Sequence, residues 1–355
     1  MKAVVYYNED NIRCEDIVKP VIGDGEILVR MKACGICGGD LMHWYRRTKA
    51  PLVLGHEITG EVIELGGRVE NFKIGDRVFV HHHIACLTCH FCLHGDFIHC
   101  SRFSKNRIYP GGFAEYIRVS APIVNGDVLL LPPAVSYEYG TLIEPLACCI
   151  KGIARTGLEL GDLLLIIGAG PVGIMNIQLA KRVMGAGTVI VSETLERRRQ
   201  YAKQFGADIV VDPSKQQIIR VVRDASNGVG ADAVMVNVSN VPAIQQGLEA
   251  VRNGGVVVIF APPAPEESLT LNSNELFFTE KKIVSSYTAS HQETRQALKL
   301  LESNTVDLKG IITHGYEMEN AADAFREAEQ REALKVVITN AGAFTRLNRE
   351  KPSRL

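Results

Sequence analysis

The pattern of apolar residues changes near residue 157 of this 355-residue chain. Before that point, short apolar runs at residues 27–31, 62–65 and 77–80 are separated by pairs such as Gly-Asp and Gly-Gly. Glycine supplies the backbone conformations that tight turns need. This part of the sequence therefore predicts a compact domain of short strands and turns.

The second part of the chain carries continuous apolar runs, which are typical of parallel strands buried on both faces. Helical spacing over residues 174–183 and a polar helix over 197–205 separate the first three runs. This alternation predicts right-handed βαβ units and a doubly wound sheet. The runs lie at residues 163–167, 188–191, 209–211, 233–236 and 256–260.

The last part of the chain shows two further helical stretches, at residues 292–303 and 321–329, and a final apolar strand at 335–338. The residues from Ala341 on are weakly patterned, and we expect them to fray. The patterns together predict an α/β protein that joins a β domain to a doubly wound parallel sheet.

Composition and charge exclude several classes of function. Hydrophobic residues make up 46% of the chain and charged residues 22%, which is ordinary for a globular protein. The net charge of -1 gives no electrostatic reason to expect nucleic acid or an anionic membrane as a partner. No apolar run approaches the roughly 18 residues of a membrane span. The acidic start lacks a signal-peptide core, so we expect a cytoplasmic protein.

The nine cysteines are clustered, which in a reducing cytosol indicates metal binding or catalysis rather than disulfides. Four thiolates match the tetrahedral coordination of zinc, so a four-cysteine group predicts a structural zinc, with an iron–sulfur cluster as the alternative. His81, His82 and His83 precede this group and are either extra ligands or packing side chains; four cysteines already fill a zinc site, which favours packing. The group comprises Cys86, Cys89, Cys92 and Cys100.

A Gly-x-Gly-x-x-Gly segment follows the apolar run at residues 163–167 and opens a helical stretch. In this context the glycines allow a tight turn, close approach of a pyrophosphate and close packing of helix on strand. The helix N-terminus then supplies N–H donors to the phosphates. A glycine turn that binds no cofactor is the alternative. The expected cofactor-binding residues of this loop are Gly168, Gly170, Pro171, Val172 and Gly173.

Glu193 ends the next predicted strand, 20 residues after Gly173. A carboxylate there can accept hydrogen bonds from both ribose hydroxyls and would repel a 2′-phosphate, which favours NAD over NADP. Arg197, Arg198 and Arg199 follow at once and weaken this preference, and we include Arg198 among the expected cofactor-binding residues.

A mixed set of metal-binding side chains is spread over the first 150 residues. Cys37 lies in a Cys-Gly-Ile-Cys-Gly segment, His56 and Glu57 follow a glycine, and Glu144 precedes a proline. A thiolate, an imidazole and a carboxylate form the kind of ligand set found in catalytic zinc sites, which keep one position open for substrate.

Together these motifs resemble the zinc-dependent medium-chain dehydrogenases, especially their polyol (sorbitol-type) and threonine dehydrogenase branches. The resemblance runs from Lys2 to about Thr339 and also rests on Gly-Phe-Ala-Glu-Tyr at 112–116 and Glu-Pro-Leu at 144–146. It implies a GroES-like β domain over residues 1–155, completed by 286–355, and a Rossmann domain over 156–285. It also implies two zinc ions per chain, one catalytic and one structural, with NAD as the cofactor and a homodimer or homotetramer.

The resemblance also implies roles for the mixed set. Cys37 and His56 would bind the catalytic zinc, and Asp40 would orient His56. Glu57 would be a third ligand or a partner of the ligands, while Glu144 would contact zinc directly or through water.

The chain departs from this family beside Cys37. Family members commonly carry Ser or Thr two residues after the zinc cysteine and often His five residues after it, and these pass the alcohol proton to solvent. Here the two positions are Gly39 and Met42, and His43 stands one residue late. The proton would then leave through water, Glu144 or a second substrate hydroxyl.

The resemblance leaves the substrate open. Ser286 and Gly315 stand where sorbitol dehydrogenases commonly carry arginine. We expect oxidation of a secondary alcohol in a vicinal diol, as in a polyol, cyclitol or sugar, to a ketone by hydride transfer. A threonine-type amino alcohol is one alternative. A non-catalytic dinucleotide-binding protein with only a structural zinc is the other. Trp44 would line the substrate pocket or belong to the core.

Overall fold

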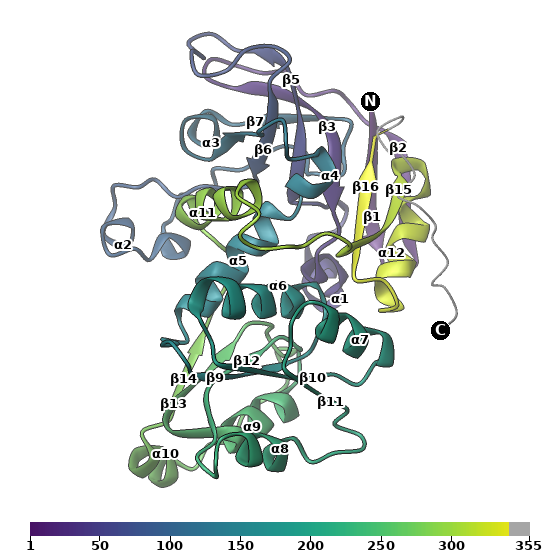
Figure 1. Ribbon diagram of the computed structural model, residues 1–355. Helices are drawn as coiled ribbons and strands as arrows, with labels where there is room; N and C mark the ends of the chain where they lie inside the picture. The colour runs from purple at the N-terminus through teal and green to yellow at the C-terminus, as the bar shows by residue number, and fades with distance from the viewer. Residues whose placement is uncertain (341–355) are drawn as a thin grey trace. The chain divides into compact units, whose positions relative to one another are not determined.

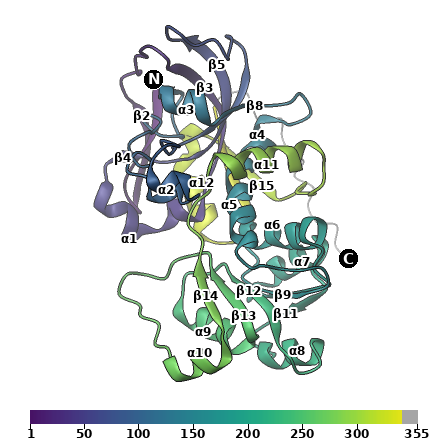
Figure 2. The same cartoon turned by 90° about the vertical axis from the view of Figure 1, so that its left-hand side faces the viewer.

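The computed structural model describes residues 1–340, so the expectation for the chain from Ala341 on lies outside the described residues. The chain forms two compact units, one containing Met1–Leu142 and the described residues from Ile312 on, the other Ile143–Ile311 (Figure 1). The expected domain boundaries, 155/156 and 285/286, both fall inside the second unit and stay a prediction. The difference arises because α5 (Ile143–Ala154) and α11 (His291–Glu302) pack against each other within that unit (Figure 2).

Distant parts of the chain share one sheet in the first unit, as expected for a GroES-like domain. Strand β16 (Lys335–Thr339) pairs antiparallel with β3 (Ile27–Gly35), which places Val337 opposite Gly35. The strand order is β15-β16-β3-β5-β6-β8, with β7 also paired to β3, and a second sheet has the order β2-β1-β4. The remaining bounds are β1 Lys2–Asn8, β2 Asn11–Asp16, β4 Leu52–Val53, β5 Glu57–Leu65, β6 Arg77–His81, β7 Tyr116–Val119, β8 Val128–Leu130 and β15 Ile312–Glu317.

Short helices fill the connections of the first unit, and the longest of them, α12 (Ala321–Glu329), packs on β15 and β16. Phe113 and Phe325 meet edge to face in the core beneath α12, with ring centroids 5.8 Å apart. The other helices are η1 Gly38–Leu41, α1 His43–Arg46, η2 Arg47–Lys49, α2 His90–Leu93, η3 Phe97–His99, α3 Ala121–Gly126, α4 Tyr137–Gly140 and η5 Met318–Asn320.

The second unit is the doubly wound parallel sheet that the apolar runs predict. Its six strands have the order β11-β10-β9-β12-β13-β14, and every pairing is parallel. All five residues of β9 are buried, as expected of a central strand covered on both faces. The strands are β9 Leu163–Ile167, β10 Thr188–Ser192, β11 Ile209–Val211, β12 Ala231–Val236, β13 Val251–Ile259 and β14 Lys282–Ser285.

Helices cover both faces of this sheet, with α6 and α7 on one face and α8 and α9 on the other (Figure 1). The helix expected over 174–183 begins earlier, at Pro171, because proline suits the first turn of a helix. Its last turn is a π-helix, Ala180–Met184, which ends at Gly185 in the left-handed conformation. The other helices are α7 Glu196–Gln204, α8 Ile218–Ala225, α9 Val241–Ala250 and α10 Ser273–Thr279.

None of the helices within residues 1–340 is both long and apolar enough to cross a membrane.

Candidate active site and metal centres

The first candidate site is built on a tight turn at Cys37. Cys37 is the N-cap of η1, and its Sγ accepts a hydrogen bond from the backbone N–H of Gly39 at 3.4 Å. Asp40 completes a capping box, because its Oδ2 accepts from the N–H of Cys37 at 3.1 Å. The turn therefore fixes the Cys37 sulfur and the Asp40 carboxylate at the same time.

His56 and Glu57 enter the same site from the start of β5. The preceding Gly55 has a φ of +90°, and a Cβ there would lie 2.8 Å from the backbone nitrogen of Phe113. Only glycine fits this close approach of two backbones. The sharp bend at Gly55 directs His56 and Glu57 toward Cys37.

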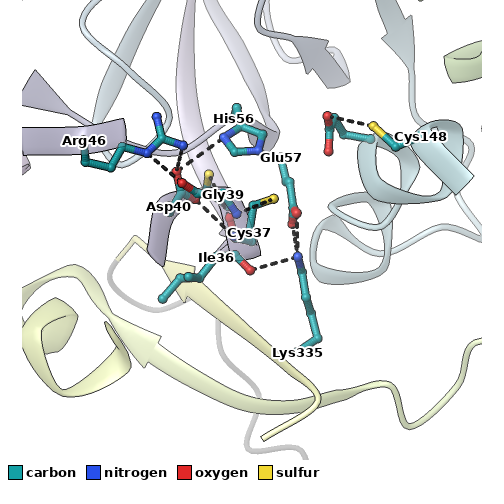
Figure 3. Close-up of polar contacts among 12 residues, drawn as sticks. Ile36, Cys37, Gly39, Asp40, Arg46, His56, Glu57, Cys148 and Lys335 are labelled. Carbon is teal, nitrogen blue, oxygen red and sulfur yellow. Dashed lines mark hydrogen bonds and ion pairs between the residues drawn. The ribbon is translucent and has the colours of Figure 1, made fainter. Parts of the chain in front are cut away.

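The structure brings Cys37, His56 and Glu57 together, with one possible ligand atom from each within 4.8 Å of the others. Asp40 Oδ1 lies 3.5 Å from His56 Nδ1, which leaves Nε2 of the imidazole to face a metal (Figure 3). Thiolate and imidazole are zinc ligands, so the donor set fits zinc. The geometry also agrees with the orienting role expected for Asp40.

Burial and charge act in opposite directions on these groups. Burial raises the pKa of Asp40, but the adjacent His56 and Arg46 outweigh it and hold that pKa below its usual value. Burial lowers the pKa of His56, but Asp40 and Cys37 outweigh it, so that pKa lies well above its usual value. Asp40 and Cys37 thus favour a positive charge at His56. A bound metal cation would supply that charge in place of the proton.

Glu57 is already engaged by a cation of the protein. Its carboxylate forms a buried ion pair with Lys335, and the Lys335 ammonium also donates to the carbonyl oxygen of Ile36 at 3.0 Å (Figure 3). Glu57 and Lys335 are 0% and 3% exposed. This pairing makes Glu57 a partner of the site more readily than a direct ligand, because a metal would compete with the ammonium for the carboxylate.

Glu144, the fourth expected member, belongs to the second compact unit. It lies at the start of α5 and is 3% exposed. Its Oε1 accepts a hydrogen bond from Cys148 Sγ, one helical turn later, at 3.4 Å. The role expected for Glu144 stays a prediction.

The four-cysteine group forms a second candidate metal centre. The four sulfurs lie within 4.8 Å of one another, with Cys89–Cys92 at 3.5 Å and Cys86–Cys92 at 4.0 Å. A tetrahedron with Zn–S bonds of 2.3 Å has edges of about 3.8 Å, so these separations fit zinc. Hydrogen bonds from Thr88 lower the pKa of Cys86 to about 6, which favours the thiolate that a metal needs. The group is completed by Cys100.

The three histidines before this group are not part of the four-cysteine cluster in the described chain. His81 Nδ1 lies 2.6 Å from Asp127 Oδ2, and both side chains are buried. His83 packs on Phe103, with ring centroids 3.9 Å apart. The ring of His82 lies 5.0 Å from that of His56. These contacts agree with packing for His81 and His83, and one ring nitrogen from each of the three histidines also lies within 4.8 Å of the others.

The glycine loop joins β9 to α6 in the second unit, as expected for a dinucleotide-binding turn. Gly168 has a φ of +97°, and a Cβ on Gly173 would lie 2.2 Å from the Gly168 carbonyl oxygen. Gly170 is the N-cap of α6, and a Cβ there would lie 3.6 Å from Arg198 Nη1. The guanidinium of Arg198 therefore lies beside the turn where a pyrophosphate would bind.

Glu193 lies at the end of β10 and is also bonded to the loop. Its Oε2 accepts from the N–H of Ala169 at 2.8 Å, and its Oε1 accepts from the N–H of Leu195 at 2.9 Å. A carboxylate offers about four acceptor positions. Glu193 thus shapes the loop and retains capacity for a ribose hydroxyl.

The sequence alone indicates no role for two residues of the site, Lys335 and Arg46. Lys335 is separated from Glu57 by 278 positions, so no local spacing could reveal the pair. The available signal was a lysine that opens an otherwise apolar strand.

Trp44 is 40% exposed, which rules out the core alternative for this side chain. The Nε2 atom of the neighbouring His43 lies 3.2 Å from Glu329 Oε1.

Comparisons with known proteins agree with this arrangement. Residues 23–126 match the model of the alcohol dehydrogenase GroES-like domain, and residues 171–303 match that of the zinc-binding dehydrogenases. The chain is 34% identical to sorbitol dehydrogenase of Bacillus subtilis, over 95% of this chain and 97% of that protein. It is 36% identical to L-threonine 3-dehydrogenase of Pyrococcus horikoshii, over 91% and 93%.

A zinc-binding dehydrogenase of Sinorhizobium meliloti, crystallised with NADP, has a similar structure, with a TM-score of 0.86 and 28% identity over 95% of this chain and 98% of that one. Identity above 30% over nearly the full length, both family models and the shared fold lead to one conclusion. The chain belongs to the zinc-dependent medium-chain dehydrogenases, enzymes that oxidise or reduce alcohols with zinc and a nicotinamide cofactor.

Proposed function

We propose that this enzyme oxidises a secondary alcohol of a polyol, cyclitol or sugar to a ketone and transfers the hydride to NAD. The observation that carries the proposal is the convergence of Cys37, His56 and Glu57 in a chain that also carries a complete dinucleotide loop. The similarity to sorbitol dehydrogenase supports the polyol class.

We assign the catalytic zinc to Cys37 and His56 and the structural zinc to the four-cysteine group, two ions per chain. Zinc at the first site supplies Lewis acidity toward a substrate oxygen. Cys37 is fixed by its turn, and Asp40 holds His56 in one orientation. Glu57 lies buried beside these two ligands and is paired with Lys335.

We assign cofactor binding to the glycine loop, Glu193 and Arg198. The N-terminus of α6 and the nearby guanidinium would hold the pyrophosphate. Glu193 would accept a hydrogen bond from a ribose hydroxyl, which supports NAD rather than NADP as the cofactor. Proton release cannot use position 39 or 42, because Gly39 and Met42 carry no proton-transferring group. Water, Glu144 or a second substrate hydroxyl would fill that role.

We also propose a cytoplasmic homodimer or homotetramer. A reducing compartment keeps the clustered cysteines free to bind metal, which supports the location.

The test is formation of NADH or NADPH by zinc-loaded enzyme with polyols, cyclitols, sugars, amino alcohols and simple primary alcohols, each with NAD+ and NADP+. We expect turnover of vicinal diols with NAD+. Turnover only of amino alcohols would favour the threonine-type alternative, which the 36% identity to L-threonine 3-dehydrogenase motivates. Reaction of simple primary alcohols alone would contradict the vicinal-diol prediction.

A further inference from the structure

Arg46, the last residue of α1, turns back onto the Cys37 turn (Figure 3). Its Nε donates to the carbonyl oxygen of Gly39 at 2.7 Å, and its Nη2 donates to Asp40 Oδ1 at 3.3 Å. The side chain is 13% exposed. One guanidinium therefore donates hydrogen bonds to both the backbone and the carboxylate of the same turn.

Asp40 connects Arg46 to both assigned zinc ligands. One carboxylate oxygen accepts from the N–H of Cys37, and the other faces both Arg46 Nη2 and His56 Nδ1. Asp40 is 1% exposed. A carboxylate this deeply buried requires charged or hydrogen-bonding partners. Arg46 is the partner of Asp40 whose side chain is always charged.

Gly39 fits the same arrangement. A Cβ at position 39 would lie 3.4 Å from Arg46 Nη2 and 3.7 Å from Cys37 Sγ. A side chain at this position would extend from a Cβ already in contact with both groups. At these distances the Cβ would make ordinary van der Waals contact with both groups, so position 39 lies directly beside the guanidinium and the cysteine sulfur.

We propose that Arg46 is a positioning residue for the catalytic zinc: through Gly39 and Asp40 it holds Cys37 and His56 in the geometry that retains the metal. The inference rests on the zinc site assigned under the proposed function. Arginine suits the task because its planar fork reaches two acceptors at once, whereas a lysine ammonium is a point charge. Loss of a residue that orients metal ligands typically lowers metal affinity 10- to 100-fold.

The experiment measures transfer of zinc from the holoenzyme to a coloured chelator. Wild-type enzyme should release zinc in two phases, and the phase absent from Cys37→Ser belongs to the catalytic site. In Arg46→Ala that phase should be about 10- to 100-fold faster, with the other phase unchanged. In Arg46→Lys the rate of that phase should lie between the wild-type rate and the Arg46→Ala rate. Arg47→Ala is the matched control, because the neighbouring Arg47 is 61% exposed and pairs with Glu9; it should release zinc at the wild-type rate.

Two results would overturn the inference, and they are distinguishable. If the wild type releases two zinc ions and Arg46→Ala and Arg46→Lys release both at wild-type rates, Arg46 has no positioning role but the zinc site stands. If the wild type holds a single zinc that Cys37→Ser retains, the assigned catalytic site and the role of Arg46 both fail. Should Arg46→Ala not fold, the catalytic phase of Arg46→Lys decides between these outcomes.

Discussion

The buried pair of Lys335 and Glu57 shows how strongly one residue can depend on another in this protein. Both side chains are almost fully buried, and the lysine also donates to the carbonyl of Ile36. A buried ion pair adds little net stability over an apolar pair, because both charges lose their hydration. Removing one partner is different, since the other charge then stays buried and unpaired.

We predict that Lys335→Met lowers the free energy of unfolding by about 3–5 kcal/mol, because Glu57 is left without its cation. Urea titration of the purified protein measures the change. Lys282→Met is the control, since Lys282 also opens a strand but is exposed. The double variant Lys335→Met, Glu57→Gln should recover part of the loss. A Lys335→Met protein as stable as Lys282→Met would contradict the prediction.

Sequence spacing revealed those site residues that lie close together in the chain. The four cysteines fall within 15 positions, and the glycine loop within six. Lys335 carries no such signal, because the pairing of β16 with β3 brings it to Glu57 from 278 positions away. Arg46 lies only six positions from Asp40, but no motif marks it, because its contact depends on how α1 places its side chain. Their roles depend on tertiary structure, which spacing alone does not specify.

The loop between β9 and α6 depends on one close contact between its ends. A Cβ on Gly173 would meet the carbonyl oxygen of Gly168 at 2.2 Å, and backbone cannot move aside as a flexible side chain can. Gly173 thus lets α6 begin close to the strand, with its N-terminus at the phosphate-binding turn.

We predict that Gly173→Ala weakens NADH binding by about tenfold or more, a change of about 1.4 kcal/mol, because the loop must open to admit the methyl group. Quenching of protein fluorescence by NADH measures the dissociation constant. Gly23→Ala is the control, since its nearest neighbour is a side-chain oxygen at 3.7 Å and its φ is not positive. Equal affinities for the two variants would show that this close contact does not shape the cofactor site.

The helices and strands were predicted best where burial produces a continuous apolar run in the sequence. The apolar runs of β9, β10, β11 and β12 located the parallel sheet correctly. The apolar run predicts strand β5 only over 62–65, but the strand begins at Glu57. Its first residues include buried polar side chains, and Thr59 donates to the carbonyl oxygens of Ala33 and Tyr137. Such partners come from distant segments, so the apolar pattern of the sequence does not extend the strand to these polar residues.

The two compact units divide the chemistry. Both assigned zinc sites lie in the unit built from the start and the end of the chain, and the dinucleotide loop lies in the other. A protein that only bound a dinucleotide would need no second set of metal ligands beyond a structural one. The convergence of Cys37, His56 and Glu57 therefore separates the enzyme from the non-catalytic alternative.

The most direct test of this central claim is the zinc content of the purified protein by mass spectrometry. We predict about two zinc ions per chain for the wild type and about one for Cys37→Ser, because one site closes and the four-cysteine site remains. Cys14→Ser, which alters a cysteine outside both groups, should keep about two. About one zinc in the wild type, unchanged in Cys37→Ser, would contradict a catalytic zinc at Cys37.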